Sequence, residues 1–190
     1  RGDEGAIPGL RRALDDWAPD ARMEALWALD LCGGLDKPTA LRLLEDSDPF
    51  VRRWVVRRIG DGDLDWVRPA GDAGRPGAKP RGGVSDAGGV LRIPDAIAAK
   101  LRDLSSREPS PIVRAQLAST AARVPAALGL DLAAALATRH EDRDDPHIPL
   151  LTWWAVERHA AADPAGVLSR FATPDTWSAP LAVEVILPRL

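Results

Sequence analysis

The chain has 190 residues, of which 45% are hydrophobic and 28% are charged, and its formal net charge at pH 7 is −3. This balance is typical of an ordinary globular protein, and the negative charge argues against a nucleic-acid-binding module, which is usually basic. No apolar run approaches the roughly 18 residues that a membrane-spanning helix needs, so we expect no membrane span. Tyrosine is absent and alanine, leucine and arginine are abundant, which favours helices over sheets.

A phrase that opens a helix occurs four times along the chain. The copies are PDARMEALWALDL from Pro19, DPFVRRWVVRRIG from Asp48, SPIVRAQLASTAA from Ser110 and DPHIPLLTWWAVE from Asp145. They are 30, 62 and 35 residues apart when they are aligned on Ala21, Val51, Val113 and Ile148. Because one helix pair cannot bury its apolar stripe alone, the recurrence predicts stacked pairs that share one continuous core.

We therefore predict an all-α fold, an α-solenoid of about five HEAT-like antiparallel helix pairs with one long Gly/Pro-rich insertion. The predicted pairs cover residues 5–31, 37–59, 94–123, 128–161 and 163–190. Residues 1–190 are predicted to form a single repeat domain, and we expect it to be a fragment of a longer chain.

The start of each second helix carries its own signals. Short polar side chains are expected to cap these helices at Asp20, Asp48, Ser110 and Asp145. First-turn prolines are expected at Pro49, Pro111 and Pro146.

The 62-residue step reflects an insertion over residues 60–93. Nine of the 16 glycines lie between Gly60 and Gly89, and the segment has no hydrophobic periodicity. One interpretation is a flexible excursion, and another is that Trp66 and Val67 anchor it onto the helices or onto a partner. A third is that the chain is an enzyme subunit in which Trp66 and the insertion form a lid over a pocket. A phosphate-binding loop is not indicated, because Lys79 is followed by proline and not by a hydroxyl side chain.

Arginine recurs after the first aligned residue of three copies, as Arg22, Arg52 and Arg114. These residues could form a row that binds phosphates, or a structural ladder that faces aspartates such as Asp16 or Asp46 in adjacent turns. The negative net charge favours the ladder.

The sequence offers no catalytic or metal-binding motif. Acidic residues and one histidine crowd a single turn at Glu141, Asp142, Asp144, Asp145 and His147, but they lack the ligand spacing of a calcium loop. We therefore predict no catalytic residue, no metal site and no cofactor in this chain. Cys32 is expected to be a structural thiol at a helix end, and His140 and His159 are expected near helix ends.

Seven tryptophans are unusual in so small a chain. The apolar stripes predict that four of them lie in the core, at Trp17, Trp27, Trp54 and Trp153. Trp154 is rotated by about 100° from its neighbour, so it either packs against the following repeat, which we expect, or is an exposed anchor. The candidate partner contacts are Arg53, Arg57, Trp66 and Trp154.

Two strings of this sequence, SPIVRAQLASTAARVPAAL and LAAALATRHEDRDDPHIPLLTWWAVE, resemble a known family. They are similar to the helical-repeat region of the planctomycete-type (PVC-type) haem-binding, membrane-bound dehydrogenase-like proteins. The stretch EALWALDLCGGLDKPTALRLLEDSDPFVRRW resembles the same region. In that family a β-propeller similar to sugar dehydrogenases precedes HEAT-like repeats, and a cytochrome c domain with a CxxCH motif closes the chain.

The resemblance implies a non-catalytic scaffold, a spacer between propeller and cytochrome, in a periplasmic or cell-envelope parent that carries haem c. Cys32 lacks the second cysteine and the histidine of a haem motif, so no haem ligand carries over to this chain. The expected partner is a protein or a neighbouring domain of the same parent, and nucleic acid is not expected. The alternative is a DNA-binding helical-repeat protein of the alkylation-repair glycosylase type.

Overall fold

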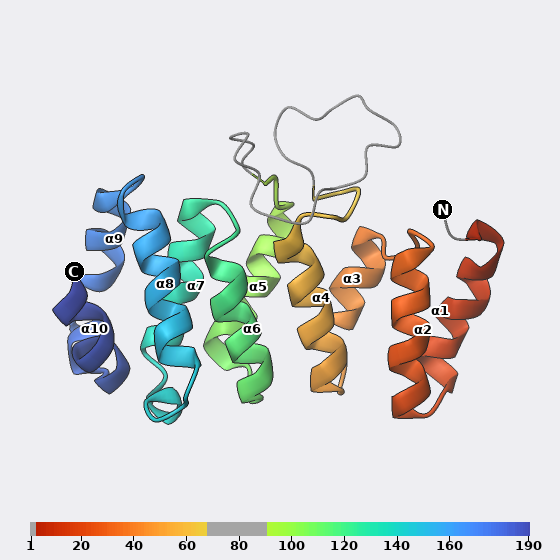
Figure 1. The fold of residues 1–190 in the computed structure, drawn as a ribbon, viewed down its shortest axis with the longest axis horizontal. Coiled ribbons are helices and arrows are strands. Elements are labelled where there is room, and N and C mark those ends of the chain that lie inside the picture. The colour runs from red at the N-terminus through yellow and green to blue at the C-terminus, as the bar shows by residue number, and fades with distance from the viewer. Residues whose placement is uncertain (1–2, 68–90) are drawn as a thin grey trace.

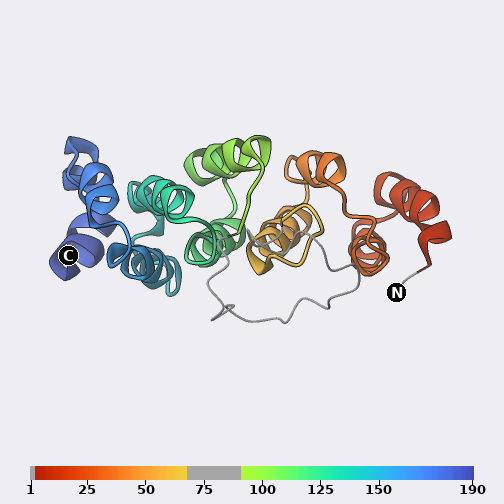
Figure 2. The same cartoon turned by 90° about the horizontal axis from the view of Figure 1, so that it is seen from above.

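The computed structural model describes residues 3–67 and 91–190, and every regular element in these ranges is helical. The helices lie side by side along the long axis of the molecule (Figure 1). Seen from above, they alternate between two layers (Figure 2). The prediction of an all-α fold is confirmed.

The helices follow the predicted pairs closely. The first layer contains α1 (Ile7–Asp16), α3 (Lys37–Leu43), α5 (Asp95–Arg107), α7 (Ala126–Ala137) and α9 (Pro164–Phe171). The partners of the first four are α2 (Pro19–Leu31), α4 (Pro49–Asp61), α6 (Pro111–Ala121) and α8 (Ile148–Ala160). The chain continues after α9 as α10 (Pro174–Ser178), η3 (Ala182–Ile186) and η4 (Leu187–Arg189), and two short turns of 3₁₀ helix are η1 (Glu4–Ala6) and η2 (His140–Asp142). We call the layer formed by α2, α4, α6 and α8 the second-helix layer.

Two of the four predicted capping residues accept hydrogen bonds from backbone amides at a helix start. Asp48 is the N-cap of α4, and its carboxylate accepts a hydrogen bond of 2.8 Å from the Phe50 amide. The Asp145 carboxylate accepts from the Ile148 amide at 2.9 Å, although the N-cap of α8 is His147.

The other two predicted caps are wrong in part. Ser110 is the N-cap of α6 but makes no side-chain cap bond. The helix α2 begins at Pro19 with Ala18 as its N-cap, so Asp20 lies inside the first turn. Proline at the first position already has the φ angle of a helix, which moves the start of α2 one residue ahead of the expected site. Pro146 lies before α8, whose first-turn proline is Pro149.

The core runs without a break between the two layers. One cluster of buried apolar side chains includes members of every pair, among them Leu26, Val55, Leu117, Val156 and Phe171. Because each pair shields the apolar stripe of the next, no single pair has a core of its own.

The pairs on either side of the insertion meet most closely at α4 and α6. The Thr120 hydroxyl donates to the Val56 carbonyl at 3.2 Å, and an added Cβ at Gly60 would lie 2.8 Å from both side-chain branches of Thr120. Arg123 also forms an ion pair with Asp61. Glycine at position 60 therefore permits the short distance between the two helices.

The start of the insertion packs onto the helices. The Trp66 indole donates to the Leu35 carbonyl at 2.9 Å, and Leu64 and Val67 are buried. The anchoring of Trp66 and Val67 on the helices is thus confirmed. Residues 68–90, to which most of the predicted flexible insertion belongs, lie outside the described residues.

The prediction for the tryptophans is only half right. Trp54 and Trp153 pack against the core as expected. Trp17 and Trp27 are 51% and 44% exposed, because Trp17 lies in the turn after α1 and Trp27 faces away from the first layer. Trp154 is 53% exposed, so the alternative of an exposed position applies to it.

Within the described residues, no helix has both the length and the apolar character needed to cross a bilayer.

The contact between α4 and α6 yields the first prediction. Gly60→Ala should lower the free energy of unfolding by a net ~1–2 kcal/mol, because overpacking costs more than the better helix propensity of alanine contributes. The measurement is urea unfolding followed by circular dichroism. Gly9→Ala is the matched control, since nothing lies within 4 Å of a Cβ at this exposed position of α1, and it should be neutral or stabilising. Equal stabilisation by both substitutions would contradict the close contact.

Candidate interaction surface

The three equivalent arginines of the second-helix layer lie between consecutive pairs. Arg22 donates from Nε to the Leu14 carbonyl at 2.6 Å and from Nη2 to the Asp46 carboxylate at 2.5 Å. It thereby joins the last turn of α1 to the turn after α3. The predicted contact with Asp46 is confirmed.

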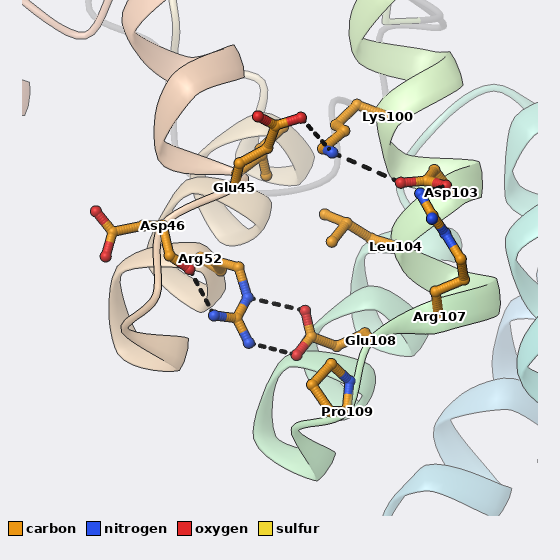
Figure 3. Close-up of a pocket in the computed structure, with 10 residues that line it drawn as sticks. Glu45, Asp46, Arg52, Lys100, Asp103, Leu104, Arg107, Glu108 and Pro109 are labelled. Atoms are coloured by element: carbon orange, nitrogen blue, oxygen red, sulfur yellow. Dashed lines mark hydrogen bonds and ion pairs between the residues drawn. The ribbon is translucent and has the colours of Figure 1, made fainter.

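The second arginine repeats this arrangement (Figure 3). Arg52 binds the Glu108 carboxylate through two hydrogen bonds of 2.9 and 2.5 Å, and its Nη1 donates to the Asp46 carbonyl at 2.6 Å. Because Glu108 caps α5, the contact connects the two pairs on either side of the insertion.

The third arginine has the same geometry one pair further along. Arg114 binds Asp142 through hydrogen bonds of 2.7 and 2.5 Å, and it donates to the Glu108 and Pro109 carbonyls at 3.0 and 2.7 Å. The hydrogen bonds that Arg114 donates to the Asp142 carboxylate raise the pKa of its guanidinium. Both partners are buried, and such a pair is stable only when its hydrogen bonds are satisfied, as they are here.

These contacts confirm the structural ladder. The guanidinium groups of Arg22, Arg52 and Arg114 donate hydrogen bonds to carboxylates and backbone carbonyls of the protein. These donors are therefore not free to bind a phosphate group. The expectation for Asp16 is wrong, because this exposed carboxylate receives no arginine in the part of the chain that the structure describes. The ladder ends at α8, where Pro149 occupies the arginine position.

Two acidic side chains of the turn before α8 form ion pairs within the protein. Asp142 binds Arg114, and Arg139 forms an ion pair of 2.6 Å with Glu141. A hydrogen bond from its own backbone amide and the contact with Arg139 hold the pKa of Glu141 below its ordinary value. Across residues 3–67 and 91–190, no group of three or more histidine, cysteine or acidic side chains is placed to hold a metal ion.

The other residues with reactive side chains, one cysteine and two histidines, lie at helix ends or near them. Cys32 is the C-cap of α2 and is followed by Gly33 in the left-handed conformation, with φ of 75°. The ring Nε2 of His159 lies 2.8 Å from the Ala121 carbonyl at the end of α6, in a buried position. His140 is exposed in η2. Within residues 3–67 and 91–190, none of the three forms a hydrogen bond or ion pair with a side chain that could act as an acid, base or nucleophile.

A cleft lies between α3 and α5, and charged side chains line it (Figure 3). Lys100 lies between Glu45 and Asp103, at 2.7 and 3.5 Å, and Arg107 is bound to Asp103. With Arg52 bound to Glu108, each cation that lines the cleft already has a carboxylate partner. The cleft therefore presents paired charges rather than converging free groups, and it does not have the character of an active site.

Large apolar side chains are instead exposed on the second-helix layer. Trp27 on α2 is 44% exposed, Phe50 on α4 is 54% exposed and Trp154 on α8 is 53% exposed. A groove between α2 and α4 is lined by Met23, Trp27, Pro49 and Phe50, with Glu24 and Asp48 among its polar residues. An exposed apolar surface with polar residues around it is typical of an interaction site.

The groove continues into an aromatic contact on α4. The rings of Trp27 and Trp54 lie 5.8 Å apart at an angle of 60°, and the Arg57 guanidinium lies 5.6 Å from the centre of the Trp54 ring. Arg53 is exposed one turn before Arg57 on the same helix. The tilted aromatic contact and the cation–π contact are both attractive, so these three side chains pack against one another.

The predicted partner contacts are distributed over two places. Arg53, Arg57 and Trp154 belong to the second-helix layer, with Trp154 two helices away from the arginines. Trp66 follows α4, is half-buried and donates to the Leu35 carbonyl.

Sequence reasoning missed Met23, Trp27 and Phe50 as surface residues. A signal was present for Trp27, because Trp27, Arg57 and Trp154 each stand six residues after the aligned start of their copy. One position of the repeat is therefore exposed in three helices.

No protein family, curated protein or solved structure matches this chain.

The buried pair at the centre of the ladder yields the second prediction. Arg114→Met should lower the free energy of unfolding by ~3–5 kcal/mol, because it leaves the Asp142 carboxylate buried without a partner. The double variant Arg114→Met/Asp142→Leu should regain most of this loss. Urea unfolding measures both.

The control for this prediction is Arg42→Met, which breaks the exposed ion pair between Arg42 and Asp15. An exposed pair contributes about 1 kcal/mol or less. A loss at Arg114 no larger than the loss at Arg42 would show that the ladder does not hold the pairs together.

Proposed function

We propose that this chain is a HEAT-like α-solenoid that acts as a non-catalytic scaffold or protein-interaction module. The observation that supports this function is the exposure of Trp27, Phe50 and Trp154 on the second-helix layer, in a frame whose pairs are joined by buried ion pairs. The partner binds the second-helix layer, and the ladder holds that layer in a fixed shape.

The energetics favour a binding role for these side chains. Burial of one large apolar side chain contributes ~1.5–3 kcal/mol of free energy. Trp27, Phe50 and Trp154 are each about half exposed, so part of this free energy is gained only when a partner covers them. Tryptophan and arginine are the residues that most often dominate protein interfaces. Because the frame is already ordered, a partner does not have to order it on binding.

The ladder also bears on the choice between protein and DNA. DNA binding of the alkylation-repair glycosylase type would use a row of arginines on phosphates. Arg22, Arg52 and Arg114 form such a row in the sequence, but their donors are bonded within the protein. A protein partner is therefore the proposal that we develop.

The resemblance of the repeats extends this proposal to the parent chain. In a haem-binding dehydrogenase-like parent of the cell envelope, the module would be the spacer that holds the propeller and the cytochrome c domain in register. The haem would belong to the cytochrome domain. The coding sequence that follows this segment should then contain a CxxCH motif.

Peptide selection provides the third prediction. A phage library of random 12-residue peptides, which reach about 40 Å when extended, is panned on the wild-type protein. The enriched peptides are synthesised, and their affinity is measured by fluorescence anisotropy. Trp27→Ser or Trp154→Ser should weaken binding of these peptides about tenfold or more, because an anchor at the interface is lost.

The matched controls are Trp17→Ser and Leu168→Ser, which remove exposed apolar side chains of 51% and 65% exposure outside the second-helix layer. They should leave the affinity unchanged. If no peptide is enriched, or if the controls weaken binding as much as the Trp27 and Trp154 variants, the proposed surface is wrong.

A further inference from the structure

The exposed face of α4 carries two positive charges that the fold does not neutralise well. Arg53 forms no ion pair with any described residue. Arg57 lies 3.6 Å from Asp61, but that carboxylate is also bound by Arg123 and lies 3.6 Å from Arg58. The two arginines are one turn apart on the same helix, where like charges repel each other. An anion at this face would relieve that repulsion.

Aromatic side chains alternate with these arginines along α4. Phe50, Arg53, Trp54 and Arg57 follow at helical spacing, so they form one continuous ridge. Next to this ridge lies the groove lined by Met23, Trp27 and Pro49. Apolar and cationic groups are therefore available within the same small area.

The groove beside this ridge carries acidic groups. Glu24 on α2 lines it, is exposed and forms no ion pair with the described residues, and Asp48 lines it at the start of α4. The basic residue of its lining, Arg22, is bound to Asp46. A ligand carboxylate is therefore attracted to the arginines of the ridge and repelled by the acidic groups of the groove, which fixes the direction in which a ligand lies.

We propose that this surface, defined by Met23, Glu24, Trp27, Phe50, Arg53, Trp54 and Arg57, binds an acidic peptide segment with an aromatic or aliphatic anchor. The anchor enters the groove between α2 and α4, and the acidic residues of the peptide bind Arg53 and Arg57. This inference rests on the proposed function and names the chemistry of its partner.

Charge complementarity excludes the other obvious ligands of an aromatic groove. Trimethylated lysine binds between aromatic rings, but Arg53 and Arg57 would repel its charge. Single-stranded nucleic acid stacks on aromatic rings as well, but it needs a basic groove that follows its backbone. Here the arginines of α4 lie on one ridge beside a groove that Glu24 and Asp48 line, and the chain as a whole has a net charge of −3.

The experiment compares three labelled probes on the intact 190-residue protein by fluorescence anisotropy. The acidic probe is the peptide GDELWEDG, the basic probe is GKKLWKKG, and the anchor-free probe is GDESSEDG. The acidic probe should bind in a saturable way, about tenfold or more tighter than either of the other two. Its affinity should fall as salt rises from 50 to 300 mM, because charged contacts are screened.

Charge variants then locate the site. Arg53→Glu/Arg57→Glu should weaken the acidic probe about tenfold or more, whereas Glu24→Gln should strengthen it about twofold. A gain of affinity at Glu24 is a result that a merely unspecific apolar surface would not produce. The matched control is Arg12→Glu, which reverses an exposed arginine of α1 in the other layer and should have no effect beyond about twofold. Circular dichroism verifies that each variant is folded.

The outcomes separate this inference from the proposed function. If Trp27→Ser weakens the selected peptides but charge reversal of probe or protein changes nothing, the acidic partner is wrong and the interaction surface stands. If neither Trp27→Ser nor charge reversal changes the affinity, both the acidic partner and the interaction surface are wrong. If a labelled 12-residue oligo(dT) binds more tightly than the acidic peptide, the ligand is nucleic acid and the inference is overturned.

Discussion

The arrangement of this protein depends on arginines that are buried between consecutive helix pairs. A guanidinium group has five donors, and burial without partners is costly, so its neighbours must supply oxygen atoms on several sides. Arg52 and Arg114 meet this requirement with backbone carbonyls of their own pair and a carboxylate of the next pair. Each contact therefore sets the distance between two pairs. The apolar core alone could not do so, because hydrophobic contact is not directional.

The fixed spacing explains how the exposed layer acquires a defined shape. Buried side chains are mostly apolar in every pair, whereas exposed positions differ from one helix to the next. At the position six residues after the aligned start, α2 has Trp27, α4 has Arg57, α6 has Ser119 and α8 has Trp154. The buried positions hold the helix pairs together, and the variable ones give the exposed layer its surface chemistry.

The sequence predicted the helix pairs and the ladder because both depend on local spacing. Periodicity locates an apolar stripe, and the equivalence of Arg22, Arg52 and Arg114 follows from alignment of the copies. The exposure of Trp27 could not be read in this way, because a residue at the edge of a stripe is covered or open according to how neighbouring helices pack. Glu108 was not foreseen as the partner of Arg52 for a related reason, since the insertion separates them in sequence and the packing of the pairs on either side of it brings them together.

The most direct measurement is native-state hydrogen exchange of the amides of α4 and α6 in the wild-type protein and in Arg52→Met. The account predicts that both helices exchange with similar protection in the wild type, because the ladder joins their pairs into one cooperative unit. In Arg52→Met, α1 to α4 should lose protection while α6 to α8 keep theirs. If α4 and α6 of the variant retained wild-type protection together, the arginine ladder would not be what unites the pairs.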